Sequence, residues 1–237
     1  MKFRLLDEFR KLFEGQRYRH RDSSLGDRVA QHLYEDLLTI GKSRLLAQRI
    51  ASHDYVLNVE NKRRGIKSRR GDGSFGELIP GTAAIVDPGF SVGRGPIANV
   101  EIGIEVKIAA KAMIKQIDRV CSDLRGQVDH FHRGANNPIC VGIVGINSAP
   151  YTVSYEGERS FRTNGQKYKH PVDEAAEAEA RIRAEAAHKF TEFVFLRYRA
   201  TNEPPFPFEW ADYDGTLQDY SAALTRISRA YDVRFGT

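Results

Sequence analysis

The sequence predicts an α/β fold, on the strength of two strand-like and two helix-like stretches. Residues 100–108 alternate apolar and polar side chains, which is the period of a strand with one apolar face. Residues 139–146 form a continuous apolar run, typical of a strand buried on both faces. Residues 25–40 and 109–131 carry apolar side chains at helical spacing. A chain of 237 residues, 41% of them hydrophobic, can bury such a core.

The N-terminal part of the chain is expected to lead into this core. Residues 2–14 have the apolar spacing of an amphipathic helix, and a basic connector follows, so residues 1–24 form one segment. The first core helix then ends near Gly41, and residues 43–50 extend the helical region. Residues 55–59 and 83–86 are short strand candidates. Residues 60–76, dense in Lys, Arg, Gly and Asp, predict a mobile loop or a hairpin near the active face.

The C-terminal part of the chain is expected to complete the core and then to extend beyond it. Residues 151–170 mix aromatic and basic side chains around an Asn164-Gly165 turn signal, which predicts a hairpin insert. A helix over 173–190 and a strand over 191–200 end the core, which therefore spans residues 25–200. Residues 201–237 are expected to form a Pro-rich arm and a closing helix that packs or dimerises.

Composition bounds the class of protein. The net charge is +5, and two cysteines are too few for a disulfide framework or a cysteine-based zinc site. No apolar run approaches the roughly 18 residues of a membrane span, and the N-terminus lacks the pattern of a signal peptide. A cytoplasmic protein without a membrane partner is expected. The absence of a Gly-x-x-x-x-Gly-Lys motif argues against an NTP-driven enzyme.

Polar residues on the predicted strands carry the candidate chemistry. Gly93, Gly95 and Pro96 predict a hairpin turn, and antiparallel pairing across it would set Asp87 opposite residues 102–105. Glu105 and Lys107 point to one face of their strand because they are two residues apart. Two carboxylates on adjoining strands can share Mg²⁺. Lys107 could then orient or deprotonate the attacking water, or offset charge on phosphorus.

Asp87, Glu105 and Lys107 resemble the signature of the PD-(D/E)xK nuclease superfamily, although here proline follows Asp87 instead of preceding it. The predicted order of helix, motif-bearing meander, helix and strand is similar to the restriction-endonuclease-like core. The resemblance implies a mixed central sheet flanked by helices, Asp87 and Glu105 as ligands of Mg²⁺, with Mn²⁺ able to substitute, and Lys107 as the catalytic lysine. Additional candidate ligands are Glu35, Glu77 and Glu101.

The resemblance implies a magnesium-dependent DNA endonuclease of restriction or DNA-processing type. Cleavage of both strands would need two sites and hence a homodimer, and a restriction role would imply a partner methyltransferase. Two alternatives stay open: a structure-selective junction or repair nuclease, and a catalytically silent DNA-binding or assembly protein. Candidate DNA-binding residues lie in a basic cluster, on the helix after the motif strand and in the insert: Lys62, Arg63, Arg64, Lys67, Arg69, Arg70, Lys111, Lys115, Arg162 and Lys167.

Overall fold

The computed structural model describes residues 2–19, 24–58, 72–111, 113–134, 137–156, 158–165 and 171–236. The helices are α1 (Arg4–Lys11), α2 (Ser24–Ile40), α3 (Arg44–Ser52), α4 (Met113–Phe131), α5 (Pro171–Glu185), the 3-10 turn η1 (Ala187–Lys189) and α6 (Tyr213–Phe235). The strands are β1 (Tyr55–Asn58), β2 (Gly73–Glu77), β3 (Ile102–Ala109), β4 (Ile139–Asn147), β5 (Thr152–Glu156), β6 (Arg159–Thr163), β7 (Glu192–Ala200) and β8 (Phe208–Trp210).

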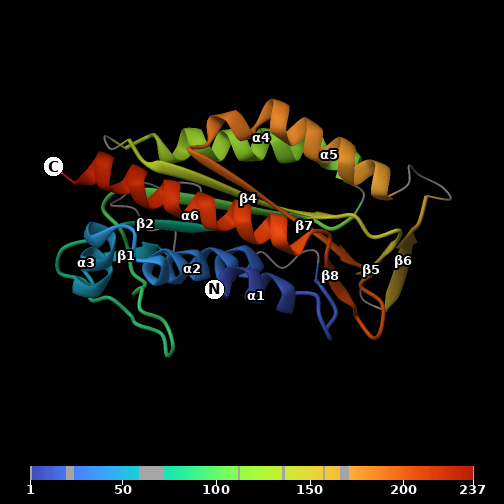
Figure 1. Ribbon diagram of the computed structural model, residues 1–237, viewed down its shortest axis with the longest axis horizontal. Coiled ribbons are helices and arrows are strands. Elements are labelled where there is room, and N and C mark those ends of the chain that lie inside the picture. The colour runs from blue at the N-terminus through green and yellow to red at the C-terminus, as the bar shows by residue number, and fades with distance from the viewer. Residues whose placement is uncertain are drawn as a thin grey trace.

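A mixed sheet forms the centre of the molecule. Within the described residues it has six strands in the order β1-β2-β3-β4-β7-β8. Strands β3, β4 and β7 are parallel, and the flanking pairs β1–β2, β2–β3 and β7–β8 are antiparallel. Helices α4 and α5 cover one face, while α1, α2 and α6 pack on the other (Figure 1). The predicted α/β class is confirmed. None of the helices described is long and apolar enough to cross a membrane.

The burial of the two central strands, β3 and β4, explains the hydrophobic patterns in their sequences. All of β4 is buried, as expected for a parallel strand covered on both faces. On β3, Ile102, Ile104 and Val106 belong to the core shared with α1, α2 and α6. Gly103 points the other way, and a Cβ placed there would lie 2.5 Å from the ring of Phe131 on α4. Helix α4 can therefore lie close to β3 only because position 103 has no side chain.

A buried carboxylate joins three helices on the opposite face. Asp36 of α2 is fully buried. It accepts hydrogen bonds from the backbone N–H groups of Arg4 and Leu5, at 2.7 and 2.9 Å, and from the hydroxyl of Tyr220 at 2.9 Å. Burial raises the pKa of Asp36, and these donors act in the opposite direction. The N-terminal helix and the closing helix are thus bound to the core through a single side chain.

The expected hairpin over residues 83–108 is wrong. Residues 83–101 are irregular apart from isolated bridges, and the antiparallel neighbour of β3 is β2. Strand β2 lies at the end of the stretch predicted as a loop or hairpin, and it pairs with both β1 and β3. A Cβ at Gly73 would lie 2.7 Å from the Cβ of Ala30, and one at Gly76 would lie 2.1 Å from the carbonyl oxygen of Asn99. Glycine here permits close packing within a strand and does not mark a loop.

Smaller differences concern element ends. The β5–β6 turn lies between Glu156 and Arg159, which are paired, and not at Asn164-Gly165. Strand β3 continues to Ala109, so the helix after it begins at Met113. The Pro-rich arm contributes β8, which pairs with β7 at the sheet edge.

Gly103→Ala is expected to destabilise the protein by about 1–3 kcal/mol, because the new methyl group overpacks the interface with Phe131. Urea unfolding measures the change. Gly126→Ala is the matched control on α4, since nothing lies within 4 Å of its Cβ position. The control should gain up to about 1 kcal/mol from helix propensity. Equal stability of Gly103→Ala and wild type would contradict this packing.

Candidate active site

The register of β2 on β3 brings an aspartate to the motif strand. Gly73 pairs with Ile104, so one step outward sets Asp72 against Glu105. The Asp72 carboxylate accepts a hydrogen bond from the backbone N–H of Val106, with 2.7 Å between N and Oδ2. Asp72 is not among the predicted site residues because it directly precedes β2, in a stretch predicted as a loop or hairpin. The signal in the sequence was an acidic residue directly before a short stretch, Gly73 to Phe75, in which polar and nonpolar residues alternate as in a strand.

Glu105 and Lys107 lie on the same face of β3, as predicted. This is the face toward α4, because Gly103, two residues earlier, lies under Phe131. The Glu105 side chain is 8% exposed and that of Lys107 is 30% exposed, with 2.5 Å between Nζ and Oε1. Both groups are held within the fold, and Lys107 keeps access to solvent.

The charge state of Lys107 bears on the chemical role that its side chain can have. Burial alone would lower the pKa of this lysine, but neighbouring carboxylates outweigh burial and raise the pKa above its ordinary value. In order of effect, these carboxylates belong to Glu105, Asp72 and Asp123. Lys107 is therefore an ammonium at neutral pH. In this state, without a bound cation, the Lys107 ammonium can donate to water or to a phosphate oxygen.

Asp87 does not lie opposite the motif strand, so the expected pairing is wrong. Isolated bridges join Ile85 to Arg94 and Arg94 to Leu57 of β1. The loop thus runs along the outer edge of β1, with β1 and β2 between it and β3. The guanidinium of Arg94 binds the Asp87 carboxylate, with 2.6 Å between Nη2 and Oδ1. This hydrogen bonding lowers the pKa of Asp87. Asp72 occupies the position that the sequence analysis expected for Asp87.

Two of the additional candidate ligands have local structural partners. Glu35 is 4% exposed, and its Oε1 accepts the backbone N–H groups of Ser91 and Val92 at 2.8 and 2.9 Å. It therefore fastens the loop after Asp87 to α2. Glu77 lies at the opposite end of β2 from Asp72 and accepts a hydrogen bond from the side-chain amide of Asn99 at 3.2 Å.

Glu101 belongs to a buried ion pair at the start of β3. Arg49 of α3 donates to both of its carboxylate oxygens at 2.7 Å, and the hydroxyl of Tyr231 on α6 also donates to it. The Arg49 guanidinium lies over the ring of Tyr55. Burial raises the pKa of Glu101, which opposes the effect of these two donors. Glu101 is 4% exposed, so this candidate ligand is buried in the fold.

The residues at the site fit a magnesium ion. Asp72 and Glu105 offer carboxylate oxygens, and Mg²⁺ binds through one or two carboxylates with water and substrate phosphate completing its shell. Over the described ranges, no group of three or more His, Cys, Asp or Glu side chains could hold a metal. Asp72 and Glu105 are therefore two candidate ligands, and both offer only oxygen atoms, the ligand type that Mg²⁺ and Mn²⁺ take.

Helix α2 approaches the site through a glycine. A Cβ at Gly26 would lie 2.7 Å from both Cγ and Oδ1 of Asp72. The bare backbone at this position leaves room for the carboxylate to reach Val106.

The predicted DNA-binding residues that are described lie on α4, on β6 and in the connection after β3. Lys111 follows β3, and Lys115 is exposed on α4. Arg162 on β6 lies over the ring of Tyr151, 3.8 Å from its centroid, and pairs with Glu203 at 3.2 Å. Outside the described residues lie Lys62, Arg63, Arg64, Lys67, Arg69, Arg70 and Lys167.

Comparison with protein-family models, curated proteins and solved structures found no match to this chain. The function of the site is therefore inferred from its own chemistry and geometry.

Gly26→Ala is expected to weaken Mn²⁺ binding by about 10- to 100-fold, the range for a change that displaces a metal ligand indirectly. The new methyl group would force the Asp72 carboxylate to move. Paramagnetic resonance of free Mn²⁺ measures the affinity, and Gly126→Ala is the matched control. Urea unfolding should show that Gly26→Ala remains folded. Wild-type affinity in this variant would contradict the placement of Asp72.

Proposed function

We propose that this protein is a magnesium-dependent DNA endonuclease of the PD-(D/E)xK type, with Asp72, Glu105 and Lys107 as its site. The observation that carries the proposal is the contact of the Asp72 carboxylate with the backbone N–H of Val106, the residue between Glu105 and Lys107 on β3. The element order supports it, since α2 precedes the β1–β2–β3 meander and α4 and β4 follow. A restriction-endonuclease-like core is proposed on the same ground.

The chemistry divides among the three side chains. Asp72 and Glu105 would hold the ion, which when bound polarises a phosphoryl oxygen and promotes ionisation of water. The Val106 N–H fixes the Asp72 carboxylate in place. The Lys107 ammonium donates to a phosphate oxygen and offsets the charge that builds there during attack. Hydrolysis then adds water across one P–O bond of the DNA backbone.

Charge favours a nucleic acid as the substrate. The chain carries a net charge of +5, and its densest basic cluster, residues 62–70, ends two residues before Asp72 in the sequence. Lys111 and Lys115 follow the motif strand directly. A homodimer would supply one site to each strand of a duplex, and a restriction role would call for a partner methyltransferase. Comparison of linear, nicked and branched DNA distinguishes a restriction-type enzyme from a structure-selective one.

Asp72→Asn and Glu105→Gln are expected to abolish Mg²⁺-dependent nicking of plasmid DNA, because each removes a metal-binding carboxylate. Lys107→Gln should lower the rate by about 10²–10³-fold, as for loss of one charge-stabilising donor. Asp87→Asn is the control, since its carboxylate is bound by Arg94 away from the site. It should cleave like wild type.

Three results would contradict this assignment. Nicking by Asp72→Asn at the wild-type rate would remove the proposed site, and loss of nicking in Asp87→Asn would favour the original motif position. A folded wild type that binds DNA without cleaving it and without taking up Mg²⁺ by calorimetry would support the silent DNA-binding alternative.

A further inference from the structure

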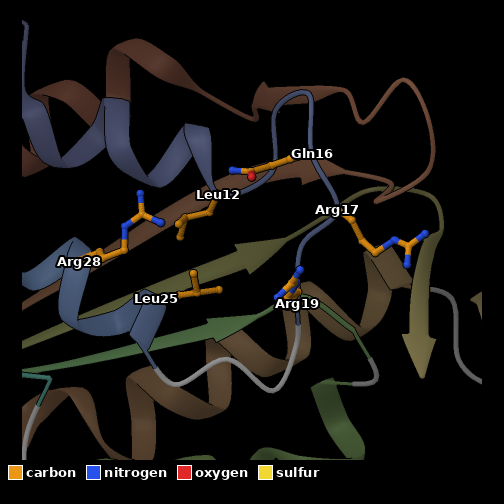
Figure 2. Close-up of a pocket in the computed structure, with 6 residues that line it drawn as sticks. All are labelled: Leu12, Gln16, Arg17, Arg19, Leu25 and Arg28. Atoms are coloured by element: carbon orange, nitrogen blue, oxygen red, sulfur yellow. The ribbon is translucent and has the colours of Figure 1, made fainter. Parts of the chain in front are cut away.

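A hollow of about 430 Å³ lies between the segment after α1 and the start of α2. Figure 2 shows Arg28 of α2 on one side, Arg17 and Arg19 of residues 15–19 on the other, and Leu12 and Leu25 between them. Gln16 completes the lining. Three arginines from two segments of the chain thus line one hollow together with two leucines. We call it the arginine hollow.

The arginine hollow adjoins the candidate active site. Leu25, which lines the hollow, directly precedes Gly26 in α2. Gly26 in turn packs against the Asp72 carboxylate, where a Cβ would approach to 2.7 Å. The first turn of α2 therefore has the hollow on one side and a metal-binding carboxylate on the other. An extended substrate could reach both.

The segment that carries two of the arginines is fixed. The backbone N–H of Tyr18 donates to Asn202 at 2.8 Å, and the Asn202 amide donates back to the Tyr18 carbonyl at 3.2 Å. Tyr18 is buried and stacks on Phe13. Arg17 and Arg19, on either side of Tyr18, are exposed. The backbone that carries both arginines is thus held in place before any ligand arrives, which lowers the entropic cost of binding.

Charge in the arginine hollow is only partly compensated. Glu8, which is 7% exposed, pairs with Arg28 and holds it in place. The Arg17 guanidinium lies over the ring of Tyr155, 3.9 Å from its centroid, on the β5–β6 hairpin. Among the described residues, no carboxylate pairs with Arg17 or Arg19. The hollow is therefore a net cationic site for an anion, and guanidinium groups match phosphate oxygens in geometry.

We propose that the arginine hollow binds a backbone phosphate of the DNA strand whose neighbouring phosphodiester enters the Asp72–Glu105–Lys107 site. This inference rests on the proposed nuclease function and adds the contact that sets the strand's path. Phosphate contacts of this kind fix register without reading sequence. Tyr155 and the β5–β6 hairpin would form the outer wall of the path.

The test measures binding of a fluorescent DNA duplex by anisotropy in EDTA, over a range of salt concentrations. Arg19→Gln/Arg28→Gln should reduce the slope of log affinity against log salt by about 2, or about 1 for each phosphate-contacting arginine. Arg19→Gln alone, which leaves the Glu8 pair intact, should reduce it by about 1. Arg229→Gln is the control, since this exposed arginine lies near the C-terminal end of α6. Its slope should equal that of wild type.

The outcomes separate this inference from the nuclease proposal. A wild-type slope in both hollow variants, or an equal loss in Arg229→Gln, would overturn the phosphate site while Mg²⁺-dependent cleavage by wild type still supported the nuclease. A reduced slope in the hollow variants together with no cleavage by wild type would support the DNA contact and reject the nuclease.

Discussion

The arrangement of the site depends on how closely α2 packs on β2. Gly73 lets the Cβ of Ala30 approach the strand, and Gly26 lets the helix pass the carboxylate of Asp72. Strand β2 pairs with β3 through Gly73 and Ile104, and the Asp72 carboxylate, directly before β2, reaches the backbone N–H of Val106. Larger side chains at either glycine would move the strand or the carboxylate. The backbone geometry thus places the acid, and the chemistry of the site follows from it.

Acidic residues divide into two groups by their partners. Asp36, Glu35 and Glu101 are buried and accept hydrogen bonds from helix ends, a loop and an arginine, so they stabilise the fold. Asp72 and Glu105 also have partners, but these belong to the motif strand itself: the backbone N–H of Val106 and the ammonium of Lys107. A buried carboxylate that loses its donors is costly, which explains why the structural acids are fully bound. Acid content alone could not have distinguished the two groups.

The sequence predicted the elements whose patterns arise from packing on one or two faces. The alternation of β3, the apolar run of β4 and the stripe of α4 each reflect burial, and the structure confirms these elements. It could not predict β2, because Gly73 and Gly76 have no side chains to show a period and serve close contacts made by distant residues. For that reason, the sequence pointed to Asp87, and not to Asp72, as the aspartate closest to the motif strand. The arginine hollow was also missed, because it combines two separate segments of the chain.

The central claim is that Asp72 and Glu105 bind one cation together. A crystal soaked in Mn²⁺ and measured near the manganese absorption edge tests it most directly. The account predicts one strong anomalous peak within coordination distance, about 2.2 Å, of both carboxylates, because Mn²⁺ takes the same oxygen ligands as Mg²⁺. A peak at Asp87, or full Mn²⁺ occupancy elsewhere with none between Asp72 and Glu105, would contradict it.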